Sequence, residues 1–202
     1  MTMKFNAAVF AVLSVLILAS CKKSVVENVK DRIGSNAPVN QYVEHNILSG
    51  THYSDKNSYK PVNTSEIKFV VKFDNSAIYR TVNPDNQGDI NKLYGFSDNN
   101  QEHHTNSARI GWRWYNNQLQ LFAYVYNNGV QSDKMITSVP INQEVNSIIK
   151  VEGNTYVFTV NGTVVTMPRV SVTSQAIGYQ LYPYFGGDEV APQNIKILIK
   201  DN

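Results

Sequence analysis

The chain has 202 residues, a formal net charge of +2 and 42% hydrophobic residues. A charge this close to neutral provides no basic surface for a phosphate backbone, so nucleic acid is excluded as the expected partner. The sequence holds a single cysteine, which also excludes an internal disulfide and a thiolate metal site.

Residues 1–20 have the three zones of a secretory signal peptide. Lys4 gives a short positive head, residues 7–18 (AAVFAVLSVLIL) are apolar apart from Ser14, and small residues precede Cys21. The apolar run is shorter than the ~20 residues that a permanent membrane-spanning helix needs. We therefore expect residues 1–20 to be removed during export.

The sequence Leu18-Ala19-Ser20-Cys21 resembles the lipobox of bacterial lipoproteins. In that family the cysteine thiol receives a diacylglycerol, and cleavage makes the cysteine the first mature residue. The resemblance implies palmitate-like acyl chains on Cys21 that anchor the protein to a membrane, since each buried methylene contributes roughly 0.8 kcal/mol. The alternative is a plain signal peptide with an incidental cysteine, but a lone cysteine in an exported protein lacks a disulfide partner. The expected location is the bacterial cell envelope, at the outer membrane.

The composition predicts a tether followed by one domain. Residues 21–41 are mostly polar and read as a lipidated cysteine with a flexible tether. From residue 42 the sequence is rich in aromatic and β-branched residues, and residues 42–202 have the length of a single domain. The domain has no cysteine, so its stability must come from packing.

Hydrophobic residues in this domain alternate with polar ones along the chain. Residues 66–73, 108–115, 118–126 and 194–200 each place apolar side chains at every second position. Strict alternation is typical of antiparallel strands with one buried face. No segment shows a sustained helical period.

Asparagine and glycine separate these strands. Asn116-Asn117 predicts a two-residue hairpin, Asn127-Asn128-Gly129 ends a strand, and Asn161-Gly162 lies between residues 156–160 and 163–167. Asn-Gly is the strongest short hairpin signal. Many short strands joined by such turns predict an all-β sandwich or barrel.

Several longer stretches carry a resemblance to a protein family. They are KFDNSAIY (72–79), DINKLYGFSDNN (89–100), HHTNSARIGWRWYNNQLQLFAYVYNNG (103–129) and YQLYPYFGGDEVAPQNIKILI (179–199). They resemble uncharacterised exported proteins of Bacteroidota-type bacteria with a concanavalin A-like jelly roll. NTYVFTVNG (154–162) and the final strand are similar to laminin G and lectin sandwiches. The resemblance implies an antiparallel β-sandwich of jelly-roll type, a fold that hosts lectins, hydrolases, lyases and adhesion modules.

The motifs of two enzyme classes with this fold are absent. Alginate-lyase-type jelly rolls use a Gln-x-His strand and a Tyr-x-Lys-x-Gly-x-Tyr strand. The second pattern is absent, and the one Gln-x-His triplet, residues 101–103, lies in an expected loop rather than on an expected strand. Glycoside hydrolases need paired carboxylates, and no expected strand carries such a pair. We therefore expect a binding module rather than an enzyme.

Two smaller patterns have chemical interpretations. His103 and His104 are candidates for a general base or for ligand binding, although one of them packing under a loop is the simpler interpretation. Two oxygen-rich loops, residues 98–102 and 186–189, are candidates for a structural calcium ion, although asparagine and aspartate are also ordinary turn formers. No other cofactor is expected.

Polar and aromatic side chains form the main candidate site, on three expected strand faces. Aromatic rings bind the C–H faces of sugars, while arginine and glutamine bind hydroxyl or carboxylate groups. The candidate ligand-binding residues are Arg109, Arg113, Tyr115, Gln120, Tyr124, Tyr126, Gln180, Tyr182 and Tyr184, with His103 and His104 beside them. The alternatives are that these tyrosines only pair across strands, or that Trp112 and Trp114 line the groove instead.

These patterns together predict a membrane-anchored, extracytoplasmic carbohydrate-binding or adhesion module, with polysaccharide as the partner. The two alternatives are a polysaccharide lyase-like enzyme and a structural envelope protein without a small ligand. A lyase would bring Arg113, a tyrosine and a histidine together in a groove, with shifted pKa values. A structural protein would present a large flat apolar patch.

Overall fold

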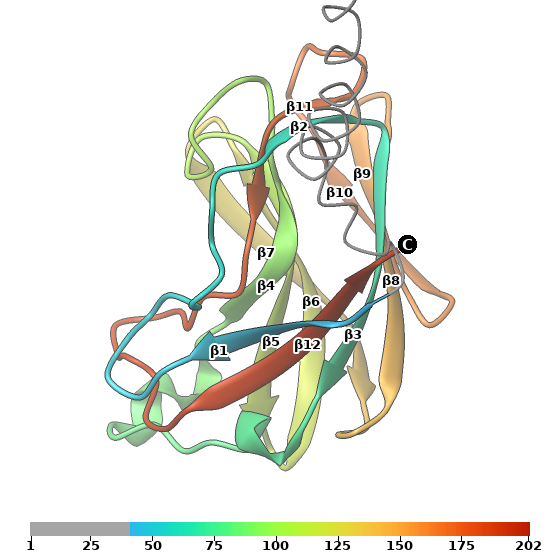
Figure 1. The fold of residues 1–202 in the computed structure, drawn as a ribbon. Coiled ribbons are helices and arrows are strands. Elements are labelled where there is room, and N and C mark those ends of the chain that lie inside the picture. The colour runs from blue at the N-terminus through green and yellow to red at the C-terminus, as the bar shows by residue number, and fades with distance from the viewer. Residues whose placement is uncertain (1–40) are drawn as a thin grey trace, which may run out of the picture. The chain divides into compact units, whose positions relative to one another are not determined.

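The domain consists of two packed antiparallel sheets, seen in the computed structural model (Figure 1). The structure describes residues 41–202. The predicted signal peptide, Cys21 and nearly all of the predicted tether therefore lie outside the described residues. No helix within residues 41–202 is long and apolar enough to cross a membrane.

Each sheet has six strands, and every strand pairs with its neighbours in the antiparallel sense. Sheet A contains, in order, β1 (Val43–Ile47), β12 (Ile195–Asp201), β3 (Glu66–Phe73), β8 (Glu144–Glu152), β9 (Thr155–Val160) and β10 (Thr163–Pro168). Sheet B contains, in order, β2 (Pro61–Thr64), β11 (Ala176–Leu181), β4 (Asn91–Ser97), β5 (Ser107–Tyr115), β6 (Gln118–Asn127) and β7 (Val130–Val139). Two short 3-10 helices, η1 (Asn75–Ala77) and η2 (Pro84–Gly88), lie between β3 and β4.

The predicted all-β sandwich is confirmed, and asparagines make its tightest turns. Asn116 and Asn117, between β5 and β6, have φ values of 50° and 58°. Asn161 and Gly162, between β9 and β10, have φ values of 46° and 86°. A positive φ at both central positions is the type I′ geometry that matches the twist of paired strands, and asparagine and glycine tolerate it best.

The core lies between the sheets and is dominated by aromatic residues. Trp112 of β5 is fully buried and lies against Phe73 of sheet A, with 5.1 Å between ring centroids. Tyr94 of β4 packs edge-on against Phe69 at 5.0 Å. Each such side chain contributes about 1.5–3 kcal/mol through burial. The alternation expected for residues 108–115 is confirmed, with Trp112 on the core side.

A buried ion pair connects β4 to the loop between β10 and β11. The Asp98 carboxylate accepts hydrogen bonds from Arg169 Nε at 2.8 Å and from the Tyr156 hydroxyl at 2.6 Å. The side chains of Arg169 and Asp98 are only 2% and 0% exposed. Arg169 also donates to the carbonyl oxygen of Thr173 at 2.7 Å, which holds the loop closed.

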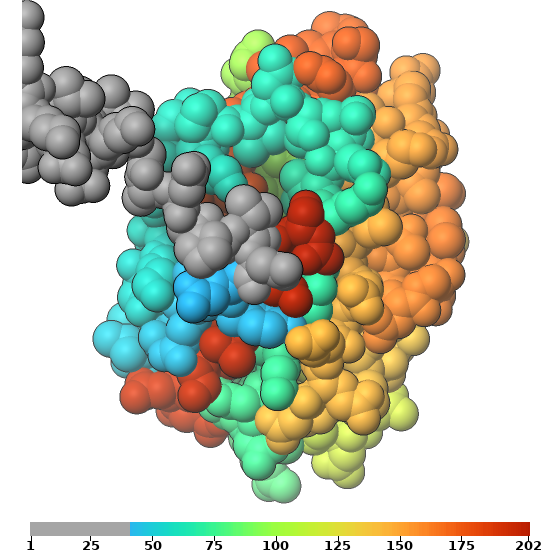
Figure 2. Space-filling model, turned by 45° about the vertical axis from the view of Figure 1, so that its right-hand side comes forward, coloured from blue at the N-terminus to red at the C-terminus, as the bar shows by residue number. Residues whose placement is uncertain are grey.

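The outer face of sheet A carries ordinary surface ion pairs. Figure 2 shows this side of the molecule, with β1 in blue beside β12 in red. Lys68 pairs with Glu66 at 2.7 Å, and Lys150 pairs with Glu152 at 2.6 Å. Exposed pairs of this kind contribute ~0–1 kcal/mol each. Two cations of sheet A thus have carboxylate partners, whereas none of the ion pairs within residues 41–202 involves Lys92, Arg109 or Arg113 of sheet B.

Candidate functional site

The outer face of sheet B brings most of the predicted site residues together. On β5, Arg109 lies opposite Tyr124 of β6 on one side and Gly95 of β4 on the other. Ser107 lies opposite Tyr126, and residues directly opposite one another in an antiparallel pair share a face. We call this region the Arg109 face, and it comprises Lys92, His103, His104, Arg109, Tyr124, Tyr126, Tyr179 and Tyr184.

Arg109 is buried at the centre of this face without a carboxylate partner. Its side chain is 5% exposed, and Nε has no hydrogen-bond acceptor. None of the ion pairs within residues 41–202 involves it. The groups that surround it are the phenols of Tyr124, Tyr126, Tyr179 and Tyr184. Burial lowers the pKa of Arg109 to about 10, so the guanidinium stays charged at neutral pH.

Lys92 of β4 adds a second cation to the face. Its ammonium group lies 4.9 Å from the ring centroid of Tyr124 and donates a hydrogen bond to the Ile90 carbonyl at 2.8 Å. Burial, followed by the charge of Arg109, lowers the pKa of Lys92 to about 8. Asp89 and Asp133 act on Lys92 from farther away, and neither forms an ion pair with it.

His103 is held in one protonation state by Tyr179. The Tyr179 hydroxyl donates its proton to Glu102 Oε2 at 2.9 Å. The same oxygen lies 2.9 Å from His103 Nδ1, so Nδ1 must carry a hydrogen and donate it. Burial and the nearby Arg109 lower the pKa of His103 to about 4. The imidazole is therefore neutral at pH 7, with the lone pair on Nε2.

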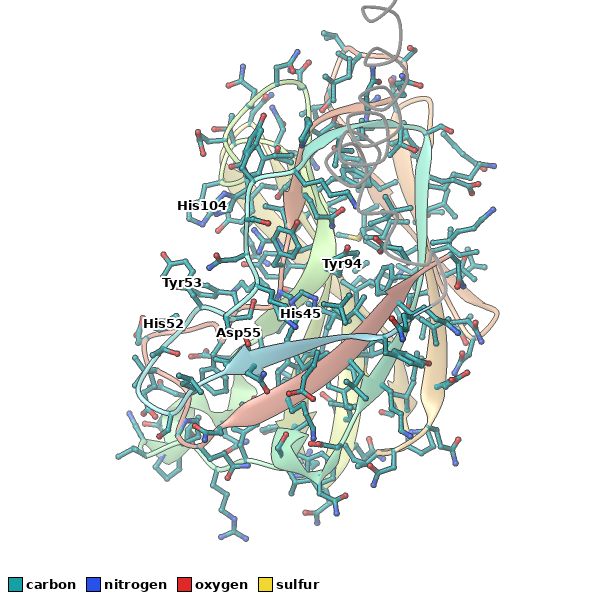
Figure 3. The ribbon with its side chains drawn as sticks, viewed as in Figure 1. His45, His52, Tyr53, Asp55, Tyr94 and His104 are labelled. Carbon is teal, nitrogen blue, oxygen red and sulfur yellow. The ribbon has the colours of Figure 1, made fainter. Side chains whose placement is uncertain are left out.

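Aromatic rings continue across the face on both sides of Arg109. Tyr124 and Tyr126 have ring centroids 6.0 Å apart, and His104 lies 5.2 Å from Tyr126. On the other side, Tyr184 stacks on His52 at 5.1 Å and meets Tyr53 edge-on at 5.0 Å. Figure 3 shows His104, Tyr53 and His52 one above another along the same side of the molecule.

Arg113 belongs to a separate cluster on the same side of sheet B. Its Nε donates to Gln120 Oε1 at 2.8 Å, and its Nη1 donates to the Gly88 carbonyl at 2.6 Å. The guanidinium lies between the rings of Tyr115, at 4.7 Å, and Phe122, at 4.8 Å. Arg113, Gln120 and Tyr115 are thus on the predicted face, but the hydrogen bonds of Arg113 join β5 to β6 and η2.

The placement of Gln180 and Tyr182 on this face was wrong. Gln180 is buried and donates to the Gly95 carbonyl at 2.6 Å, while Tyr182 packs against the core beside Tyr94. The alternation slips by one residue at Pro183, which follows the end of β11 at Leu181. Tyr184, after the proline, returns to the outer face through its bridge to Lys92.

Sequence reasoning missed four members of the site. Lys92 and Tyr179 belong to the Arg109 face, and His52 and Tyr53 extend it. Tyr179 could have been predicted in the same way as Tyr184, from the alternation of inward and outward side chains, if the one-residue slip of that alternation at Pro183 had been included. The register of β4 against β5 shifts between Lys92 and Tyr94. Because of this shift, the alternation of the sequence does not predict on which face of the sheet Lys92 lies.

Most carboxylates of the two predicted calcium loops are engaged by the protein itself. Asp98 is engaged by Arg169 and Tyr156. Glu189 accepts hydrogen bonds from the backbone nitrogens of Val82 and Asn83 at 2.8 and 2.7 Å. Within the described part of the chain, no three His, Cys, Asp or Glu side chains lie close enough together to hold a metal ion. The residues present do not fit a calcium site at these loops.

The lowered pKa of His103 predicts a change in the pH dependence of stability. As the pH falls from 6.5 towards 4, the unfolded chain takes up a proton at this residue and the folded chain does not. The free energy of unfolding therefore falls through this window. We expect His103→Gln to lose less stability than wild type between pH 7 and pH 4.5, in urea unfolding at a series of pH values. Equal slopes for wild type and His103→Gln would contradict the assignment.

Comparisons with known proteins agree on the fold. The sequence matches no known family and no curated protein. Among solved structures, alginate lyase AlyC3 superposes with a TM-score of 0.52 at 9% identity, covering 80% of this chain and 74% of its own. A functionally unknown protein from Saccharomyces cerevisiae superposes with a TM-score of 0.50 at 12% identity, covering 79% and 85%. A Bacteroides ovatus GH16 protein of a mixed linkage glucan locus gives 0.49 at 10%, covering 83% and 81%.

The domain is a concanavalin A-like jelly roll. This confirms the fold that the sequence resemblance implies. Identities this low establish the fold alone, and one fold can host many unrelated functions. In this jelly roll, the Arg109 face covers the outer side of β4, β5, β6 and β11.

Proposed function

We propose that the jelly roll binds carbohydrate on the Arg109 face and displays this face outside the cytoplasm. The observation that carries the proposal is the row of aromatic rings around a buried arginine. Tyrosine rings pack against the C–H faces of sugars, and arginine donates to their oxygens. The jelly-roll fold shared with a structure described as an alginate lyase adds general support.

The extent of the face favours a chain of sugars over a single one. Aromatic rings lie on both sides of Arg109, with Tyr126 and His104 on one side and Tyr184 with Tyr53 on the other. Tyr53 is 65% exposed, so its ring is available for stacking. A ligand that contacts both sets of rings must span several strands of sheet B. This favours an oligosaccharide or polysaccharide.

The proposal is tested by screening the purified protein against a glycan array. We expect selective binding that weakens about two- to tenfold in Tyr184→Ala, because one stacked ring contributes roughly 0.5–1.5 kcal/mol. Tyr42→Ala is the matched control, since Tyr42 contacts Glu144 of sheet A at 2.6 Å. The absence of binding to any glycan by a folded protein would contradict the proposal and favour a structural envelope role.

A polysaccharide lyase is the second candidate, favoured by one observation. The neutral His103, fixed by Tyr179, lies close enough to Arg109 for the arginine charge to lower its pKa. A base beside a cation is the arrangement that removes a proton from the carbon next to a sugar carboxylate. Incubation with acidic polysaccharides tests this. Appearance of unsaturated sugar ends, lost in His103→Gln, would support the lyase, and intact polysaccharide would leave the binding role.

We also propose that Cys21 carries the lipid anchor of the protein. The support is the lipobox resemblance of residues 18–21, which lie outside the described residues. A bacterial host grown with a labelled fatty acid should incorporate the label into wild type and not into Cys21→Ser. The wild-type protein should fractionate with membranes, and the variant should not. Label retained in Cys21→Ser would contradict lipidation at this residue.

A further inference from the structure

We infer that the carbohydrate bound by the Arg109 face is acidic, and that one of its sugar carboxylates pairs with Arg109. The inference rests on the proposed carbohydrate binding and specifies the class of sugar. Arg109 is 5% exposed, and its Nε has no acceptor among residues 41–202. An isolated charge of this kind is unfavourable in the folded chain unless an anion compensates it.

Two other described arginines, Arg113 and Arg169, show how this protein supplies hydrogen-bond acceptors to an arginine of structural role. Arg169 pairs with Asp98 and donates to loop carbonyls. Arg113 donates to Gln120 and to the Gly88 carbonyl. Each of these guanidinium groups has acceptors supplied by the chain. Arg109 is buried as deeply as Arg169, but its Nε has no acceptor among residues 41–202, so the acceptor must come from elsewhere.

The surroundings of Arg109 leave its charge uncompensated. Its nearest ionisable neighbours are tyrosines, and burial raises the pKa of Tyr124 and of Tyr184, so both are neutral at pH 7. Lys92 adds positive charge to the same face. Glu102 is exposed and accepts the hydrogen bond of Tyr179. The face therefore offers positive charge to a ligand, because no ion pair within residues 41–202 involves Arg109 or Lys92.

A carboxylate matches this site better than a neutral hydroxyl. A guanidinium presents parallel N–H groups that fit the two oxygens of a carboxylate, and such charge-assisted hydrogen bonds are about twice as strong as neutral ones. The aromatic rings beside Arg109 are suited to the apolar faces of the same sugar. A uronic acid carries both features on one ring. The geometry thus points to a polyuronate.

The test compares acidic glycans with neutral copies of the same chains. Calorimetric titrations would use oligomers of mannuronate, galacturonate and glucuronate, their carboxyl-reduced forms, and a sulfated neutral glucan. We expect at least one oligouronate to bind, and its reduced form to bind about ten- to a hundredfold more weakly. Arg109→Met should weaken oligouronate binding by the same factor. Arg109→Lys keeps the positive charge but lacks the parallel N–H groups of a guanidinium, so it should weaken binding by less. Lys72→Met removes one charge from sheet A instead and should bind as wild type does.

The outcomes separate this inference from the proposed function. Equal affinity for an oligouronate and its reduced form would overturn the acidic-sugar inference and leave carbohydrate binding intact. Binding to the sulfated glucan alone would overturn the assignment of a carboxylate. Unchanged oligouronate affinity in a folded Arg109→Met would overturn the role of Arg109. Binding to no carbohydrate by the folded protein would overturn the proposed function and the inference with it.

Discussion

Arg109→Met is expected to raise the free energy of unfolding by about 1–4 kcal/mol, by analogy with buried ion pairs, whose replacement by apolar side chains of similar volume can stabilise by that amount. The reason is that Arg109 is a buried cation whose Nε has no hydrogen-bond acceptor. The same substitution should remove binding of an acidic glycan. A substitution that raises stability but removes ligand binding is typical of a residue whose role is to bind the ligand. Urea unfolding at pH 7 measures the first effect, and calorimetric titration measures the second.

Arg113→Met provides the matched control, on the same strand and with the same chemical change. Arg113 has its hydrogen bonds, to Gln120 at 2.8 Å and to the Gly88 carbonyl at 2.6 Å. Removing them should lower the free energy of unfolding by about 1–3 kcal/mol. The two substitutions are therefore expected to have opposite signs. A loss of stability in Arg109→Met would contradict the description of Arg109 as an unpaired charge.

Asp98→Asn is expected to lower the free energy of unfolding by about 3–5 kcal/mol, because Arg169 would remain buried without its counter-charge. For a domain of this size the melting temperature should fall by roughly 6–20 °C. Burial alone would raise the pKa of Asp98, but hydrogen bonds from Arg169 and Tyr156 outweigh it and hold that pKa below its ordinary value of 3.8. The contribution of Asp98 is therefore present above pH 3.8 and is lost as the pH falls through the lowered pKa.

Two further variants isolate the ion pair. Asp188→Asn makes the same chemical change at an exposed loop position and should alter the free energy of unfolding by less than about 0.5 kcal/mol. The double variant Asp98→Leu with Arg169→Met removes both charges and should be more stable than Asp98→Asn alone. Differential scanning calorimetry of these proteins measures the differences in stability between them. A small effect of Asp98→Asn would mean that Arg169 is held by its carbonyl acceptors.

The strands of this protein could be predicted because their chemistry is local. Residues 66–73 and 118–126 alternate strictly, and the structure places β3 and β6 there. Asn116 and Asn161 mark turns because asparagine tolerates the positive φ that tight hairpins require. Each of these signals depends on neighbours within a few residues.

The candidate site could be predicted only in part, because it depends on contacts between distant segments. Arg109 and Tyr124 were recognised from alternation on adjacent strands. The same rule failed at Pro183, where the chain leaves β11 and the phase changes, so Gln180 and Tyr182 were placed on the wrong side. The distinction between the free Arg109 and the bonded Arg113 depends on Gly88, 25 residues away, and no local pattern contains it.

Along β5, the requirement for folding and the requirement for ligand binding fall on alternate positions. Ala108, Ile110 and Trp112 are fully buried against sheet A, whereas Arg109 and Arg113 lie on the outer face. A saturation library of this strand, sorted once for folded protein and once for ligand binding, should therefore enrich different alternate positions. New ligand preferences can then arise at the outward positions while the inward ones keep the fold. A strand of this kind lets specificity diverge without passing through unfolded intermediates.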